Sequence, residues 1–239
     1  MVTAVASDPA GNVSLASPGL SVLIEPPVQA AIDALGFGNA AGLDAELVRA
    51  DILAGNLDYE QFVSQLISDL QDTAVPALVV TAILSNVRPT EAHLSDLVSF
   101  TATQFAAYQA LGVARPELGP YEALGVGFSE TAAFRASYEG MDDVLFSETA
   151  YTLVFSRPPT LPQIEHFNSQ IAYFEEIYQN AGLGSAESDL RAKGAAIGQM
   201  IGHAVLDEPN LHAFDDAAIL FLRQAAAGQA NFGDPIGLI

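Results

Sequence analysis

The sequence predicts an all-α protein of about ten helices that contains an internal duplication. The first observation is a run of apolar residues at steps of three and four between positions 161 and 180, which places them on one face of a helix. The second is a corner at Pro158 and Pro159, because proline ends a preceding helix. The third is a similar stretch about seventy residues earlier, at Thr81–Gly112.

The two similar stretches, Thr81–Gly112 and Thr152–Gly182, correspond at an offset of 70 over most of their length, with a one-residue shift at Ser85 and Arg88. Each predicts a helix, a proline corner and a second helix, with Thr90 or Thr160 as the N-cap. Gln163 follows Thr160 at the spacing of a capping box. Further matched pairs are Leu94 and Ile164, Leu97 and Phe167, Tyr108 and Tyr178, and Gly112 and Gly182. We therefore expect two repeat units, at about 75–150 and 151–228.

The chain ahead of these units predicts an extended arm and three helices. Residues 1–27 are rich in Ser, Gly and Pro without a helical period, and form the arm. Helices are expected at Val28–Leu35, Leu43–Ala54 and Tyr59–Leu70, the last with Asp58 as its N-cap. The apolar run Val75–Leu84 is shorter than the roughly 18–20 residues that span a bilayer, so it predicts a buried helix or strand.

Three helices are expected between the two hairpin corners, at Tyr121–Gly127, Glu130–Tyr138 and Asp142–Phe155. Ser129 and Asp142 stand where the N-caps of the second and third would lie. Together with the flanking elements, these helices make residues 28–230 a single helical domain.

The following helix, expected at Glu187–Leu206, carries a stripe of glycines. Gly194, Gly198 and Gly202 recur every four residues, and three glycines cost a helix roughly 2–3 kcal/mol relative to alanine. We expect packing to offset this cost, with another helix approaching the stripe closely. A last helix at Leu211–Ala227 and an apolar tail at residues 231–239 complete the chain.

The charge balance excludes several classes of partner. The chain has 29 acidic and 8 basic residues, a formal net charge of −21, and no cysteine. Nucleic-acid binding needs clustered Lys and Arg, and electrostatic binding to an anionic membrane needs a basic surface, so both are set aside. Disulfides, thiolate nucleophiles and zinc–sulfur sites are absent as well.

The composition also suggests a location. An acidic, cysteine-free chain is typical of proteins outside the cell. The first basic residue is Arg49, so the N-terminal segment lacks the positively charged region of a secretory signal peptide. We expect an extracellular or cell-surface location, reached without a cleaved N-terminal signal.

The titratable residues provide one candidate metal site and no catalytic motif. The four histidines are not spaced as metal ligands, and no serine lies in a nucleophile elbow. Two acidic pairs stand at predicted helix starts, where carboxylates favour the positive end of the helix dipole and could also bind calcium. These are Asp142, Asp143, Asp215 and Asp216. We expect no catalytic residue, and no cofactor other than calcium.

Three segments resemble a family. Ser156–Thr160 and its flanking helices resemble the arginine–proline hairpin of a helical domain of unknown function, found in secreted bacterial surface-layer and RTX-type exoproteins. Ala123–Phe134 and Leu43–Leu66 are similar to two further segments of that domain. The chain departs from the family at Ser156, where the family has glycine, and in lacking its tryptophan and its glycine–aspartate calcium repeats. The resemblance implies a non-enzymatic helical module at the bacterial surface, exported by a type I system through an uncleaved C-terminal signal.

These observations leave three hypotheses for function. The first is a secreted or cell-surface structural protein that assembles with itself, through its arm and tail, or anchors to a surface glycan. The second is a helical module that binds a small apolar ligand in a cavity between helices. The third is a cofactor-independent enzyme that uses Asp or Glu pairs as acid and base.

Overall fold

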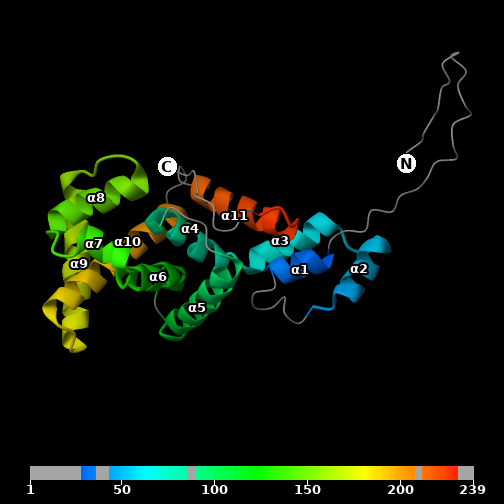
Figure 1. The fold of residues 1–239 in the computed structure, drawn as a ribbon, viewed down its shortest axis with the longest axis horizontal. Coiled ribbons are helices and arrows are strands. Elements are labelled where there is room, and N and C mark those ends of the chain that lie inside the picture. Colours follow the sequence, from blue (N-terminus) through cyan, green and yellow to red (C-terminus); the bar gives the residue numbers. More distant parts are fainter. Residues whose placement is uncertain (1–27, 36–42, 86–89, 113, 208–211, 231–239) are drawn as a thin grey trace, which may run out of the picture.

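The fold is all-α, as the sequence predicts (Figure 1). The computed structural model describes residues 28–35, 43–85, 90–112, 114–207 and 212–230. These residues form eleven α-helices and a short 3-10 turn, η2, with no strand among them. The expected arm at 1–27 and tail at 231–239 lie outside the described residues.

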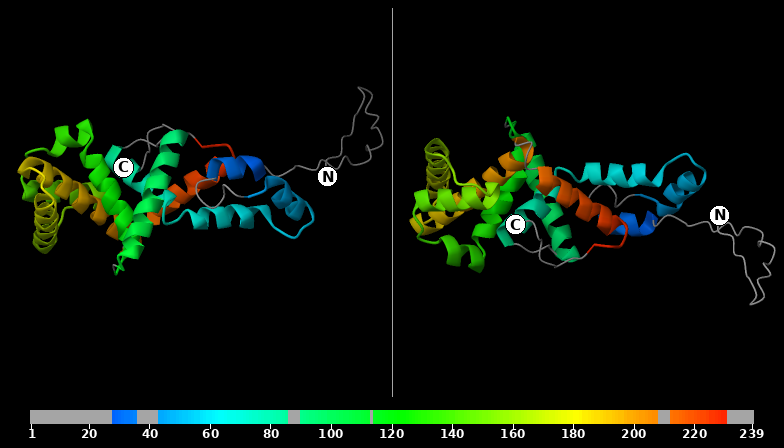
Figure 2. Two further views of the ribbon diagram at one scale, coloured as in Figure 1. Left: turned by 90° about the horizontal axis from the view of Figure 1, so that it is seen from below. Right: turned by 90° about the horizontal axis from the view of Figure 1, so that it is seen from above.

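The molecule is elongated, with α2 at one end and α8 and α9 at the other (Figures 1 and 2). The first end is built from α1, α2, α3 and the returning C-terminal helix α11, which packs on α1 and α3. The bounds are Val28–Leu35 for α1, Ala45–Leu53 for α2, Tyr59–Asp69 for α3 and His212–Ala226 for α11. The expected N-cap is confirmed, because the Asp58 side chain accepts a hydrogen bond from the Gln61 amide.

Helix α4 (Ala74–Ser85) occupies the middle of the molecule and contacts α5, α6, α10 and α11. Every residue from Ala74 to Ile83 is buried, which agrees with a sequence that is apolar all round. Of the two structures expected for Val75–Leu84, a buried helix or a buried strand, the helix is the one that forms. Among the described residues, no single helix has the length and hydropathy needed to cross a membrane; α3 and α4 meet that test only as a pair, bent by 69°.

The helices of both predicted hairpins form, and the corner of the first, at residues 86–89, lies outside the described residues. Helices α4 and α5 (Glu91–Ala110) make the first, and α8 (Asp143–Phe155) and α9 (Leu161–Asn180) make the second. Helices α5 and α9 begin and end 70 residues apart, as the repeat requires. Thr90 and Thr160 are the N-caps, and Gln163 Oε1 accepts from the Thr160 amide at 2.8 Å. The expected division into repeat units at about 75–150 and 151–228 stays a prediction, and position 151 lies inside α8.

The glycine stripe packs as predicted. Gly194, Gly198 and Gly202 lie on α10 (Ser185–Asp207) and face α6 (Gly119–Ser129). A Cβ added at Gly194 would lie 2.6 Å from the carbonyl oxygen of Gly125 on α6. No side chain fits between backbones that approach so closely, so the propensity cost of the glycines is offset by a direct helix–helix contact.

One predicted cap is wrong. Ser129 does not begin a helix; it is the last residue of α6, and its buried hydroxyl donates to the Val126 carbonyl at 2.6 Å. Helix α7 (Ala132–Tyr138) begins after Thr131, whose hydroxyl accepts from the Phe134 amide. Ser129 lies against the α10 backbone at Gly194, so tertiary packing extends α6 past the expected end. The other predicted cap, Asp142, is confirmed by its bond from the Leu145 amide.

Candidate functional site

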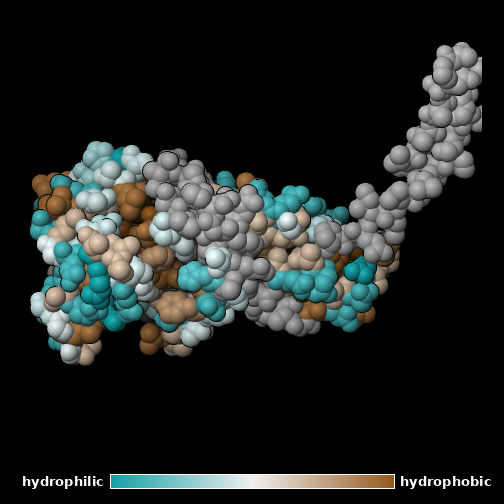
Figure 3. All heavy atoms as spheres, viewed as in Figure 1, coloured by the Kyte–Doolittle hydropathy of each residue, from teal (hydrophilic) through white to brown (hydrophobic). Residues whose placement is uncertain are grey.

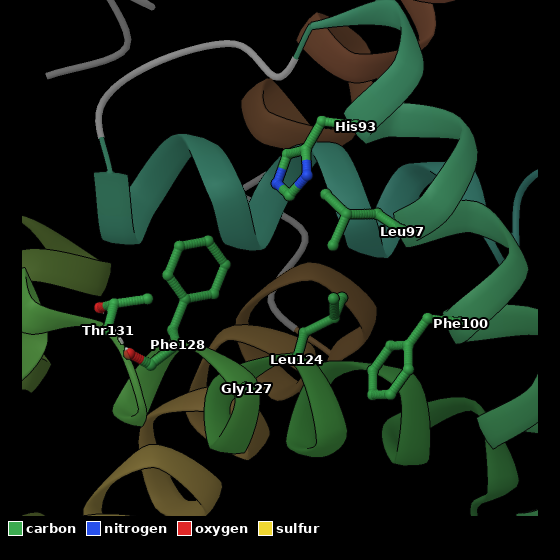
Figure 4. Close-up of a pocket in the computed structure, with 7 residues that line it drawn as sticks. All are labelled: His93, Leu97, Phe100, Leu124, Gly127, Phe128 and Thr131. Carbon is green, nitrogen blue, oxygen red and sulfur yellow. Dashed lines mark hydrogen bonds between the residues drawn. The ribbon is translucent and has the colours of Figure 1, made fainter.

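A cavity between α5 and α6 is the candidate site (Figure 4). Its position follows from helical spacing: His93, Leu97 and Phe100 lie at i, i+4 and i+7 of α5 and so share a face. Helix α6 presents Leu124, Gly127 and Phe128 from the other side, and Thr131 closes one end. Helix α4 runs behind the cavity, where it packs on both α5 and α6.

The cavity is small and apolar. Its volume is about 270 Å³, just below the roughly 300–1,000 Å³ of sites for drug-sized ligands, so it suits a ligand with about one ring. Gly127 contributes no side chain, and a Cβ added there would meet no atom within 4 Å. Phe100 is 39% exposed, so one wall of the cavity reaches the surface. Apolar side chains come to the surface over the α5–α6 region in Figure 3.

Two polar side chains line the cavity, Thr131 and His93, and they differ in whether they are free to hydrogen-bond a ligand. The Thr131 hydroxyl donates to the Phe128 carbonyl at 2.7 Å and accepts from the Phe134 amide at 3.3 Å, so its single O–H is already used. The His93 amide is used by the helix cap, but its exposed imidazole ring has no partner within the described part of the chain. The ring points into the cavity in Figure 4, and His93 is therefore the group able to hydrogen-bond a ligand.

Of the four acidic residues proposed as calcium ligands, two stand at the start of α8 and two in the first turn of α11. Helix α8 packs on α9 and α10, and α11 packs on α1, α3, α4 and, less extensively, α10. Asp142 caps α8, Asp143 lies 3.6 Å from the Lys193 ammonium, and Asp216 is exposed on α11. The side chain of Asp215 lies outside what the structure describes. Within the described residues, no three acidic or histidine side chains gather as a metal site would require.

The other two histidines with described side chains, His166 and His203, do not line the cavity. The His166 ring contacts the Phe167 ring at 5.6 Å between centroids on α9, and His203 lies 2.7 Å from Asp207 on α10. The His212 side chain is outside the described set. In the sequence nothing distinguishes one histidine from another, and only the packing of α5 on α6 places His93 at the cavity.

A second polar cluster, at Glu122, was not expected from the sequence. The Tyr108 hydroxyl and the Gln199 amide donate to the two Glu122 oxygens, at 2.6 and 2.8 Å. Burial raises the pKa of the Glu122 carboxyl. Burial, followed by the nearby Glu122 charge, also raises the pKa of Tyr178 to about 12. The cluster joins α5, α6 and α10, and none of its residues lines the cavity.

The offset of 70 was the available signal for that cluster. Tyr108 and Tyr178 are matched residues of the two units, and both lie close enough to Glu122 for its charge to raise their pKa. The sequence identified these tyrosines only as a matched pair of the two units, and nothing in the pattern pointed to Glu122.

Neither a scan against protein-family models nor a search of curated proteins finds a match to this chain.

Proposed function

We propose that this protein is a non-catalytic helical module that binds a small apolar ligand in the α5–α6 cavity. The observation that carries the proposal is the cavity itself, a space of about 270 Å³ lined by four apolar side chains, one glycine, His93 and Thr131. Apolar sites with few polar groups are typical of ligand-binding pockets. Burial of a ligand there would remove apolar surface from water, at about 25 cal/mol per Å².

A binding role is favoured over catalysis by the residues that line the cavity. His93 is the single titratable side chain among the seven, and acid–base chemistry on a bound molecule usually needs a second group to complete proton transfer. Glu122, whose pKa is raised, does not line the cavity, and both of its carboxylate oxygens already accept hydrogen bonds.

The test is a substitution that fills the cavity. Gly127→Leu should reduce affinity for ethylbenzene at least tenfold, because the new side chain occupies the ligand's space from a position where its Cβ meets no atom within 4 Å. Titration calorimetry of both proteins measures the change. The matched control is Ala133→Leu, on an exposed position of α7, which should leave affinity unchanged. Absence of ethylbenzene binding by the wild-type protein, or equal binding by Gly127→Leu, would refute the proposal.

A second candidate function is self-assembly as a secreted or cell-surface structural protein. It is favoured by large apolar side chains that remain exposed on α2 and α9. The exposed fractions of these side chains are 66% for Leu47 and 47% for Leu53 on α2, and 67% for Leu161, 59% for Tyr173 and 43% for Ile177 on α9. Exposed apolar side chains that form a contiguous patch are typical of surfaces that bind another chain. Anchoring to a surface glycan, calcium binding at the acidic pairs and export by a type I route belong to this proposal.

Light scattering after size exclusion tests the assembly proposal. We expect an oligomer whose size falls when residues 1–26 are deleted, with the helical circular dichroism of the core retained. Repeating the run with calcium and with chelator shows whether calcium takes part. A full-length protein that stays monomeric at high concentration in both conditions rules out this candidate. Fractionation of the producing cells into surface, medium and interior tests the location.

A further inference from the structure

The lining of the cavity forms two facing rows, one from each helix (Figure 4). The α5 row consists of His93, Leu97 and Phe100, and the α6 row runs from Leu124 to Phe128. His93 and Phe100 are seven positions apart, so at about 1.5 Å per residue the α5 row is about 10 Å long. Packed helices have their axes about 8–10 Å apart, so the space left between the surfaces of α5 and α6 is narrower than this row is long.

The polar groups of the cavity gather toward one end (Figure 4). His93 begins the α5 row on the side where the α6 wall ends at Phe128 and Thr131, whereas Phe100 lies toward Leu124 at the other end. The Thr131 O–H is used by the Phe128 carbonyl, so the His93 imidazole is the polar group left for a ligand. A ligand that matches this lining has one polar end and an apolar remainder.

The middle of the cavity is open because the α6 row has a glycine there. Gly127 lies between Leu124 and Phe128 in this row, and a Cβ added to it would meet no atom within 4 Å. No side chain of α6 therefore divides the polar end of the cavity from its apolar end.

We infer that the cavity binds an unbranched alkyl chain of about eight carbons that ends in one uncharged polar group, such as a primary alcohol. This rests on the proposed function and specifies its ligand. The hydroxyl bonds the His93 imidazole, which can either donate or accept, and the chain runs between the two rows toward Phe100. An extended chain advances roughly 1.25 Å per bond, so the roughly eight bonds of 1-octanol match a row of about 10 Å.

The charge of the protein favours an uncharged polar end. The lining contains no Lys, Arg, Asp or Glu, and the chain carries a net charge of −21. A carboxylate would enter this negative field and would lie beside apolar side chains, where an unpaired charge is unfavourable. The site therefore prefers an alcohol to a fatty acid of the same length.

The first test compares isomers by titration calorimetry of the full-length protein. 1-Octanol and 2-ethyl-1-hexanol have the same atoms and the same hydroxyl, and they differ only in shape. We expect 1-octanol to bind about tenfold more tightly, because a branch keeps part of the chain from entering the narrow space and each buried methylene contributes about fourfold. Octanoate at pH 8, where it is ionised, should bind more weakly than 1-octanol.

The second test measures the length of the site. From 1-pentanol to 1-octanol, affinity should rise about fourfold per methylene, and 1-nonanol and 1-decanol should add less than twofold each because their ends pass beyond Phe100. Phe100→Ala should weaken 1-octanol binding about fivefold and leave 1-pentanol unchanged, since the shorter chain does not reach that end. Tyr173→Ala, at an exposed aromatic residue of α9, is the matched control and should change neither affinity.

The third test locates the hydroxyl. His93→Leu should weaken 1-octanol binding about threefold to tenfold, the factor that one hydrogen bond typically contributes, and should not weaken ethylbenzene binding. His166→Leu, at an exposed histidine on α9, is the matched control and should leave both affinities unchanged. Circular dichroism of each variant checks that the helical fold is intact.

The outcomes separate this inference from the function on which it rests. Equal binding of the two octanol isomers, octanoate binding as tight as that of 1-octanol, or affinity that keeps rising fourfold per carbon through 1-decanol overturns the inference. Unchanged 1-octanol binding by Phe100→Ala or by His93→Leu overturns it as well. In each of these cases, binding of ethylbenzene leaves the proposed function standing. If neither ethylbenzene nor any alcohol binds the wild-type protein, the proposed function fails together with the inference.

Discussion

Gly198→Leu should destabilise the protein by about 3 kcal/mol or more. A Cβ at position 198 would overlap the Tyr121 carbonyl oxygen and would lie 3.0 Å from the Glu122 Cα. These are backbone atoms of α6, so they cannot turn aside as a flexible side chain would, and overpacking of this kind costs about 1–3 kcal/mol even where neighbours can adjust. Urea unfolding followed by circular dichroism measures the loss.

Glycine-to-alanine substitutions give the matched control. Gly198→Ala and Gly127→Ala both add one methyl group inside a helix and gain about 1 kcal/mol of helix propensity. The methyl at 127 meets open space, whereas the methyl at 198 meets the α6 backbone. We expect Gly127→Ala to be as stable as the wild type or more so, and Gly198→Ala to be less stable. Equal stability of the two would show that α6 and α10 do not touch at this crossing.

Asp189→Ala should destabilise the protein by about 2–3 kcal/mol, through the buried charge that it leaves. Lys193 is the chain's single lysine and is 1% exposed, and its ammonium lies 2.8 Å from an Asp189 oxygen. Without Asp189, the ammonium keeps the Met141 carbonyl and the more distant Asp143, 3.6 Å away. Breaking a buried pair typically costs 3–5 kcal/mol, and we expect less here because Asp189 is 27% exposed.

A double-mutant cycle separates this charge effect from lost packing. Lys193→Met removes the buried charge and keeps a side chain of similar length, so the double variant should be more stable than the sum of the two single losses predicts. We expect a coupling of about 1 kcal/mol or more in urea unfolding. Strictly additive losses would mean that the ion pair contributes nothing, and that both residues act through packing alone.

Much of the architecture could be predicted because it depends on local chemistry. Thr90, Thr160 and Asp142 are N-caps. An N-cap bonds a backbone amide two or three residues further along, so a short sequence spacing is enough to predict it. Gly182 closes α9 with a φ of 92°, a conformation that favours glycine. The glycine stripe predicted a close helix–helix contact, because only such packing offsets the helix-propensity cost of three glycines in one helix.

The candidate site could not be predicted in the same way, because periodicity shows which residues share a face but not what that face meets. The sequence alone determined an all-α fold, two hairpins 70 residues apart and a helix built for close approach. Tertiary structure decided that α6 is the partner of the stripe, that Lys193 is buried, and that His93 faces a cavity while the other described histidines do not. These outcomes depend on side-chain volumes that meet across helices distant in the chain, such as the missing side chains at Gly194 and Gly125 where α10 meets α6. Close packing makes such differences decisive, because one side chain more or fewer determines whether two helices touch or leave a space between them.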